Sequence, residues 1–137
     1  MIAAKANAET LYHLVSTPEG LAKWWAEDVF AVSEGTCSLG FFNRDTVYRL
    51  MAESKVSGKQ IVWHCETGKE WAGTRLIFDI QGTGNSTVLR FTHAGWQAET
   101  DYFLSCNTTW GELMFRLGSV AEGRNPGPLF KKSGLSY

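Results

Sequence analysis

The stretch Asp101–Glu122, DYFLSCNTTWGELMFRLGSVAE, decides the fold of this 137-residue chain. Its apolar residues recur at spacings of three and four, the pattern of a helix that keeps one apolar stripe against a large surface. The stripe consists of Cys106, Trp110, Leu113, Met114, Leu117, Val120 and Ala121. The sequence therefore predicts one long helix near the C-terminal end. Gly123 and the following Asn-Pro-Gly-Pro at 125–128 predict where it stops.

The surface that faces this helix is predicted to be a sheet. Short segments with alternating apolar and polar residues, separated by Gly, Asn and Ser, cover 36–42, 46–53, 60–66, 74–81 and 87–93. Their links are short, so the strands should pair antiparallel in a strongly twisted sheet. The long helix should cover the dry face of that sheet and can enclose a cavity there.

The N-terminal third predicts smaller elements. A short first strand lies within 1–6, and Asn7 is a suitable N-cap for a helix over 8–15. Thr17 and Pro18 repeat the start signal, so a second short helix should run through Trp25. The two helices are expected to form a lid or corner beside a sheet edge, and 26–34 is expected to be a loop.

Composition excludes several classes of protein. Length predicts a single domain, and a formal net charge of -1 with scattered Lys and Arg leaves no basic face for nucleic acid. Three widely spaced cysteines form no CxxC pair or disulfide framework, which favours free thiols in a reducing compartment. The N-terminus lacks the order of a signal peptide and no apolar run is long enough for a membrane span. A cytoplasmic protein is expected.

Five segments that agree in order carry a resemblance to a known family. They are 17–25 (TPEGLAKWW), 62–65 (VWHC), 70–74 (EWAGT), 89–96 (LRFTHAGW) and 106–113 (CNTTWGEL). With this order of elements, the chain resembles the α+β helix-grip fold of the START-like, Bet v 1-like or SRPBCC superfamily. Within it, the chain is similar to the activator of Hsp90 ATPase homologue 1-like (AHSA1-like) branch. The resemblance implies a curved antiparallel sheet wrapped around the long helix, with one domain over 1–123 and a tail over 124–137.

The resemblance also implies a range of functions, because the superfamily includes lipid carriers, hormone receptors, cyclases and chaperone regulators. This chain departs from relatives in its clipped first strand. Either the sheet closes poorly there or a neighbouring molecule covers the gap.

A set of mostly aromatic residues is predicted to line a cavity between helix and sheet. Large flat side chains with a few polar groups at the rim suit a small hydrophobic or amphipathic ligand. The alternative is that they only fill the core. The set consists of Trp25, Phe41, Tyr48, Trp63, Trp71, Phe78, Phe91, His93, Trp96, Trp110, Met114 and Leu117. Within it, His93 or Tyr48 would orient a polar end of the ligand.

His93 carries two interpretations. It ends a strand on the face of Phe91 and could bind a ligand or move a proton, or it could hydrogen-bond its surroundings and hold the loop at Gly95 and Trp96. The soft metal ligands are few and two of them, His64 and Cys65, should point to opposite faces, so no metal site, catalytic residue or cofactor is predicted.

The leading hypothesis is therefore a non-enzymatic binding module for a small molecule. The first alternative is a protein-interaction module like a co-chaperone, with a chaperone or a second copy of the chain as partner. It would use Trp24, Trp25 and Trp96 if they prove exposed. The second alternative is a cyclase- or hydrolase-like enzyme, which would need His93 and a carboxylate on one cavity wall.

Overall fold

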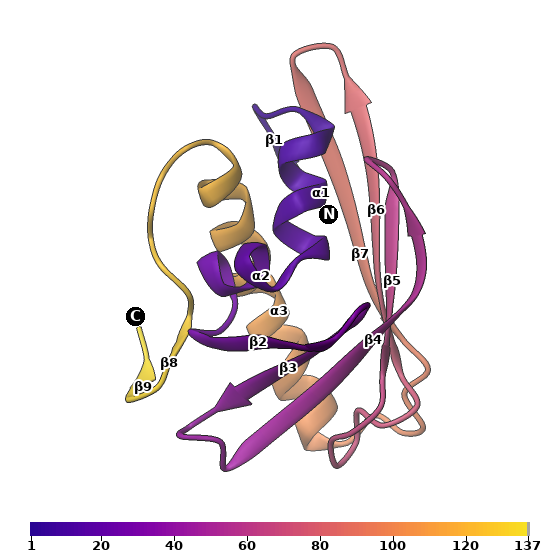
Figure 1. Ribbon diagram of the computed structural model, residues 1–137, viewed down its shortest axis with the longest axis vertical. Coiled ribbons are helices and arrows are strands. Elements are labelled where there is room, and N and C mark those ends of the chain that lie inside the picture. Colours follow the sequence, from indigo (N-terminus) through magenta and orange to yellow (C-terminus); the bar gives the residue numbers. More distant parts are fainter. Residues whose placement is uncertain (137) are drawn as a thin grey trace.

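A seven-stranded antiparallel sheet forms one layer of the computed structural model, which describes residues 1–136 (Figure 1). The strands are β1 (Ile2–Ala4), β2 (Asp28–Ser33), β3 (Thr36–Phe41), β4 (Thr46–Val56), β5 (Gln60–Cys65), β6 (Arg75–Thr83) and β7 (Ser86–Ala94). Their spatial order is β1-β7-β6-β5-β4-β3-β2, so consecutive strands from β2 to β7 are neighbours, as the short links predict. The short first strand pairs with β7 and closes that edge.

Three helices lie on the concave side of the sheet (Figure 1). They are α1 (Ala8–Ser16), α2 (Pro18–Trp24) and α3 (Asp101–Ala121). The predicted caps are confirmed, because Asn7 accepts from the backbone of Thr10 at 2.8 Å and Thr17 accepts from Gly20 at 3.0 Å. The predicted stripe of α3 is buried at Trp110, Leu113, Met114, Leu117 and Ala121 and half-buried at Cys106 and Val120. The helix-grip architecture is thus confirmed.

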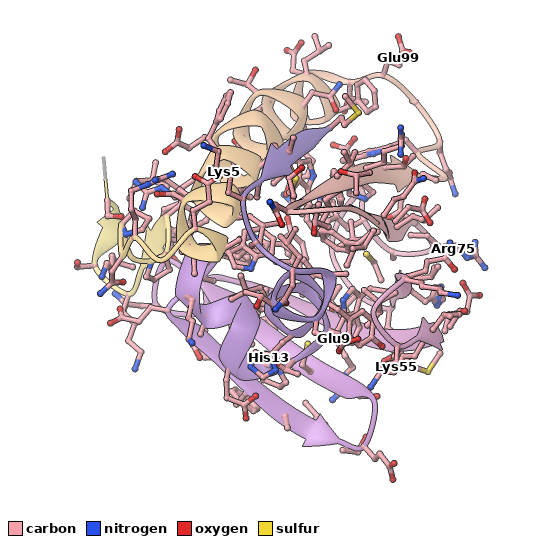
Figure 2. The ribbon with its side chains drawn as sticks, turned by 90° about the horizontal axis from the view of Figure 1, so that it is seen from above. Lys5, Glu9, His13, Lys55, Arg75 and Glu99 are labelled. Carbon is pink, nitrogen blue, oxygen red and sulfur yellow. The ribbon has the colours of Figure 1, made fainter. Side chains whose placement is uncertain are left out.

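The strands alternate as the sequence predicts. On β5 the side chains of Trp63 and Cys65 are buried, and His64 between them points the other way and is half-buried. The outer face of the sheet is exposed to solvent. Figure 2 shows Arg75 of β6 projecting away from the helices, where it pairs with Glu53 at 2.6 Å.

The expectation of a loop over 26–34 is wrong, because β2 occupies most of it and pairs with β3. β2 is an edge strand, and its apolar residues Phe30 and Val32 are exposed. Apolar residues therefore occupy both faces of β2, and its sequence lacks the alternation of apolar and polar residues that marks a half-buried strand. An ion pair of 2.7 Å between Asp28 and Arg44, in the turn after β3, ties this edge to its neighbours.

The long helix shares the concave face of the sheet with the two short helices. The helix α1 lies over β5 and β6 and is part of the core, whereas α2 packs beside the edge strand β2, where the sequence predicts a lid or corner. Trp63 donates its indole N–H to the Val15 carbonyl of α1 at 2.9 Å, and Trp24 of α2 packs edge-on against Phe78 of β6 with ring centroids 6.3 Å apart. Only the other half of the concave face remains for α3.

The C-terminal residues form an ordered strap, defined here as residues 125–136. It contains the short pair β8 (Phe130–Lys131) and β9 (Gly134–Leu135), and Phe130 bridges to Ala26. Leu129 is part of the core. The strap therefore lies along the molecule within the tail expected over 124–137, whose last residue, Tyr137, lies outside the described residues.

A chain of hydrogen bonds joins α3 to the sheet through His93. Trp110 donates its indole N–H to His93 Nδ1 at 3.2 Å, and His93 Nε2 lies 2.8 Å from the hydroxyl of Thr74. The Thr74 hydroxyl donates to the Trp71 carbonyl at 2.6 Å, so it accepts from Nε2–H. The ring is therefore neutral, and burial lowers the pKa of His93 to about 4.

Gly20 gives the first prediction, because α1 and α2 meet there without room for a side chain. A Cβ at this position would lie 2.3 Å from the His13 carbonyl oxygen and 2.6 Å from Leu14 Cα, both backbone atoms. We expect Gly20→Ala to lower the free energy of unfolding by about 2–4 kcal/mol in urea melts. The control Gly111→Ala, where a Cβ meets nothing within 4 Å, should raise it by about 0.5–1 kcal/mol. Equal effects of the two changes would contradict this packing.

The neutral His93 predicts acid sensitivity. Its pKa is near 6.5 in the unfolded chain and about 4 in the fold, so between these values the unfolded chain binds more protons. The stabilisation is complete above pH 6.5 and is lost as the pH falls toward 4. We expect wild-type stability to fall by about 1–2 kcal/mol between pH 6.5 and 4.5, after allowance for solvent at this half-buried ring.

The matched variant is His93→Phe, which cannot titrate. It should be less stable than wild type at pH 7 and should lose less stability between pH 6.5 and 4.5, measured by urea unfolding at each pH. The measurements stop at pH 4.5 because Glu53 and Glu122, whose pKa values are lowered in the fold, also change the stability at lower pH. A variant with the wild-type slope would contradict the assignment.

Candidate functional site

A cavity of about 470 Å³ opens between the first half of α3 and the ends of β3 and β4. The loop before β6 and the strap complete its walls. The lining residues are Trp25, Phe41, Phe42, Thr46, Tyr48, Trp71, Tyr102, Ser105, Cys106, Thr108, Thr109, Trp110, Glu112, Leu113, Leu129, Phe130 and Leu135. The volume is that of a site for a small molecule.

Stacked aromatic rings form the inner wall of this cavity. Tyr48 stacks on Trp71 with centroids 4.1 Å apart and planes at 4°, and Trp110 stacks on Trp71 at 5.9 Å and 19°. Trp25 lies 5.0 Å from Trp110 in a tilted arrangement. Tyr48 and Trp110 therefore pack against the indole of Trp71, whose ring nitrogen is fully buried.

The polar groups of the wall gather beside Trp71. The hydroxyl groups of Tyr48 and Tyr102 form a hydrogen bond, and Cys106 lies one helical turn after Tyr102. Burial raises the pKa of both phenols and of the Cys106 thiol. All three groups therefore keep their protons at neutral pH.

The indole N–H of Trp71 has no oxygen or nitrogen acceptor among residues 1–136, although Trp71 is only 4% exposed. It is directed at the Cys106 sulfur, a weak acceptor, and this hydrogen bond lowers the pKa of the thiol by less than burial raises it. The indole N–H of Trp96 is also buried without an acceptor in the described chain, but Trp96 does not line the cavity.

Charge is scarce around the cavity. Glu112 is the one charged side chain among the described lining residues, and it accepts from Arg116 at 3.0 Å. The same Arg116 donates to the Gly127 carbonyl at 2.9 Å and so holds the strap against α3. The cavity wall is thus close to neutral and mostly apolar.

The rim consists of aromatic residues from a tight turn and the strap. Phe130 packs edge-on against Phe41 at 4.9 Å and against Phe42 at 5.9 Å. Phe42 has φ of 53°, and Asn43 and Arg44 also have positive φ, which a bulky residue such as Phe rarely adopts. This strained turn places the Phe42 ring at the mouth of the cavity.

Five of the twelve predicted cavity residues line this space and seven do not. The five are Trp25, Phe41, Tyr48, Trp71 and Trp110. The other seven are Trp63, Phe78, Phe91, His93, Trp96, Met114 and Leu117. Trp63 and Phe78 lie beneath α1 and α2, and His93 is engaged with Trp110 and Thr74.

Lining residues on both sides of the cavity were not predicted from the sequence. Tyr102, Ser105 and Thr109 precede or interrupt the apolar stripe of α3. They are small or polar at positions where a filled core would need large apolar side chains, and this is the sequence feature that could have indicated a pocket. Leu129, Phe130 and Leu135 lie in the strap. The sequence of the strap has no periodic pattern of apolar residues, so these lining residues could not be predicted from it.

The structure bears on both alternative roles, the protein-interaction module and the enzyme. Trp24 and Trp25 are buried and Trp96 is half-buried, so the exposed tryptophan surface considered for a protein partner is absent at Trp24 and Trp25. For an enzyme-like role, the side-chain hydrogen-bond partners of His93 in the described chain are Thr74 and Trp110, neither of them a carboxylate.

Within residues 1–136 no three or more His, Cys, Asp or Glu side chains gather where they could hold a metal ion. No helix in that range has the length and apolar character needed to cross a bilayer.

Comparison with known proteins agrees with this architecture. The dimeric Aha1 of Colwellia psychrerythraea is 28% identical, with a TM-score of 0.78 over 89% of this chain and 92% of that one. An AHSA1-like protein from Rhizobium etli is 22% identical, with a TM-score of 0.67 over 93% and 82%. A Staphylococcus saprophyticus protein is 15% identical, with a TM-score of 0.69 over 90% and 92%.

No curated protein sequence matches the chain. The family model described as activator of Hsp90 ATPase homolog 1-like protein matches residues 5–122. That range runs from just after β1 to the end of α3 and includes every helix of the fold. The chain therefore belongs to the activator of Hsp90 ATPase homolog 1-like family, within the helix-grip superfamily.

Proposed function

We propose that this protein binds a small hydrophobic or amphipathic molecule in the cavity between α3 and the sheet. The observation that carries the proposal is the space itself, an open cavity of about 470 Å³ lined mostly by aromatic side chains, with a few polar groups and one carboxylate, Glu112. Small-molecule sites in proteins have this size and this composition. Proteins of the helix-grip superfamily often bind ligands or other proteins, which also supports it.

The free energy of binding would come mainly from apolar burial. Removal of about 200 Å² of apolar ligand surface from water contributes on the order of 5 kcal/mol. The costs of association and of ordering side chains reduce this value, so apolar burial of this extent gives dissociation constants on the order of a millimolar. The cysteines of the described chain are free, which fits a reducing compartment such as the cytoplasm as the site of action.

Filling the cavity tests this proposal. Thr109 lines the cavity from α3 and is half-buried, so Thr109→Trp places a large ring in the space without removing a core side chain. We expect wild type to enhance the fluorescence of the neutral probe N-phenylnaphthylamine, and Thr109→Trp to weaken its binding at least tenfold. The control Phe115→Trp, at an exposed position of α3 outside this cavity, should bind like wild type.

The folded state of both variants would be checked by thermal melting and far-UV circular dichroism. If wild type binds no probe, or if Thr109→Trp binds as tightly as wild type, the cavity is not a ligand site.

A second candidate function is regulation of a chaperone through the surface beside β1. A small groove lies between β1 and the second half of α3, where the short first strand leaves Met1 78% and Phe115 76% exposed. The family description names activators of the Hsp90 ATPase, and the Colwellia relative is a dimer, so Hsp90 or a second copy are the partners to consider.

The chaperone role predicts that the purified protein raises the ATPase rate of Hsp90. Phe115→Ser should then reduce that stimulation several-fold, because an exposed aromatic residue at such a groove has the character of an interface anchor. The control Phe30→Ser, exposed on the opposite sheet edge, should retain it. An ATPase rate that does not respond to the wild-type protein would rule out this candidate.

A further inference from the structure

We propose that the molecule in the cavity is an amphipathic cation, with an apolar body inside and an amine or quaternary ammonium group at the mouth beside Glu112. This inference rests on the proposed small-molecule function and specifies the chemical class of the ligand.

The charge on the cavity wall has one sign. Glu112 is the one charged side chain among the described lining residues, which include no Lys, Arg or His. A positively charged head group would find a counter-ion there. A carboxylate or phosphate would lose its hydration without gaining an ion pair. The wall therefore disfavours fatty-acid anions and favours cations.

Glu112 keeps one oxygen available although Arg116 lies beside it. Arg116 donates from Nε to Oε1 of Glu112 at 3.0 Å, and Oε2 has no donor within residues 1–136. The terminal nitrogens of Arg116 donate to strap carbonyl groups, that of Gly127 at 2.9 Å and that of Ser136. The side chain of Arg116 is 11% exposed and that of Glu112 is 42% exposed. The carboxylate is therefore the accessible half of this ion pair.

A second carboxylate acts on the wall near the start of α3. Glu70, in the loop before β6, accepts from the Thr100 hydroxyl. Burial is the main cause of the raised pKa values of Tyr102 and Cys106, and the charge of Glu70 raises both further. No Lys, Arg or His of the described chain opposes this effect at either group. The local potential at these two lining residues thus also favours a cation.

Aromatic rings offer a second form of cation recognition. Eight of the seventeen described lining residues are aromatic. The face of such a ring attracts a cation within about 6 Å of its centroid, because the ring quadrupole is negative there. Trp71 is already stacked between Tyr48 and Trp110, so rings nearer the mouth are the available ones. Phe42 and Tyr102 are of this kind, 46% and 37% exposed.

Phe42 is a rim residue whose position core packing does not explain. Its φ of 53° is a conformation that a bulky residue rarely adopts, and its exposed ring gains little from burial in return. Phe130 packs edge-on against it at 5.9 Å and keeps it at the mouth. Contact with the head group of a bound cation would account for this placement.

Probes that share an octyl chain test the inference on the wild-type protein. They are octyltrimethylammonium, 1-octanol and nonanoate. We expect octyltrimethylammonium to bind about three- to tenfold more tightly than octanol, the gain that a cation–ring contact gives. Nonanoate should bind most weakly. Dissociation constants would be measured by NMR titration of the indole N–H signals, below the concentrations at which the probes form micelles.

Free organic cations and the choline head groups of lipids share this chemistry. Octylphosphocholine has the same chain and the same ammonium group with a phosphate between them, so it separates the two sources. We expect it to bind more weakly than octyltrimethylammonium, because the phosphate has no cationic partner in the described lining. Tighter binding of this zwitterion would overturn the assignment to a cation and indicate a lipid head group.

Glu112→Gln tests the counter-ion, with Glu53→Gln as the matched control. Each change removes a carboxylate that pairs with an arginine, but Glu53 pairs with Arg75 on the outer face of the sheet. Glu112→Gln should weaken octyltrimethylammonium binding about three- to fivefold and leave octanol binding within about twofold. Glu53→Gln should change neither.

Phe42→Leu tests the rim ring, because leucine keeps an apolar side chain and removes the ring face. Octyltrimethylammonium binding should weaken about threefold, and octanol binding should stay within about twofold. Phe115→Leu, at an exposed position outside the cavity, is the matched control and should bind like wild type.

The outcomes separate the two proposals. If no probe binds wild type, the proposed small-molecule function fails. If octanol or nonanoate binds at least as tightly as octyltrimethylammonium, the function stands and the inference about the ligand class is overturned. The inference is also overturned if Glu112→Gln and Phe42→Leu both keep the full preference for the cation, or if cation binding survives Thr109→Trp.

Discussion

Trp110 sets the distance between the long helix and the sheet, and the remaining architecture depends on that distance. Its ring packs 4.2 Å from Phe91 of β7 and 5.0 Å from Trp25 at the end of α2, and its indole N–H is bonded to His93. A large ring fixed by one directional hydrogen bond holds α3 well away from the strands. Toward the C-terminal end of α3, Leu113 and Leu117 fill the resulting space. Toward the N-terminal end the side chains are smaller, and the space remains open.

The two short helices explain why the cavity occupies only one side of the concave face. The helix α1 packs directly on β5 and β6 and α2 packs against α1, so that Trp63 of β5 and Trp24 of α2 donate to the Val15 and Leu14 carbonyl groups of α1, both at 2.9 Å. These bonds satisfy buried indole groups with backbone acceptors near the end of α1. That half of the molecule is therefore solid. Trp71 on the other half has no comparable carbonyl partner among the described residues, and its buried indole N–H lies against the Cys106 thiol instead.

Much of the fold could be predicted because its signals are local. The periodicity of 101–122, the caps at Asn7 and Thr17, and the alternation of the central strands each depend on neighbours in the sequence. The edge strand β2 could not be recognised, since exposure of Phe30 and Val32 removes the alternation. The strap could not be recognised either, because its position depends on Arg116, which bonds carbonyl groups about ten residues away at Pro126 and Gly127.

The cavity was predictable as a region but not residue by residue. Periodicity shows which side chains point toward the concave face. It does not show whether such a side chain packs against the short helices α1 and α2 or against the long helix α3. Trp63 and Trp71 look equivalent in sequence, as aromatic residues within or next to strands. One lies under α1 and the other faces open space, because the coverage by α1 and α2 ends between them.

The composition of α3 itself gives the physical reason for an open space. Its inward positions change from Ser105, Cys106 and Thr109 in the first half to Leu113 and Leu117 in the second. Larger apolar side chains in the first half would bury more surface, and unfilled core volume lowers stability by roughly 24 cal/mol for each Å³ that stays empty. Water and the polar groups of Tyr102 and Cys106 offset part of that cost, but they do not remove it. A sequence shaped by stability alone would fill this site, so the small residues of α3 that leave it open are what the proposed small-molecule function requires.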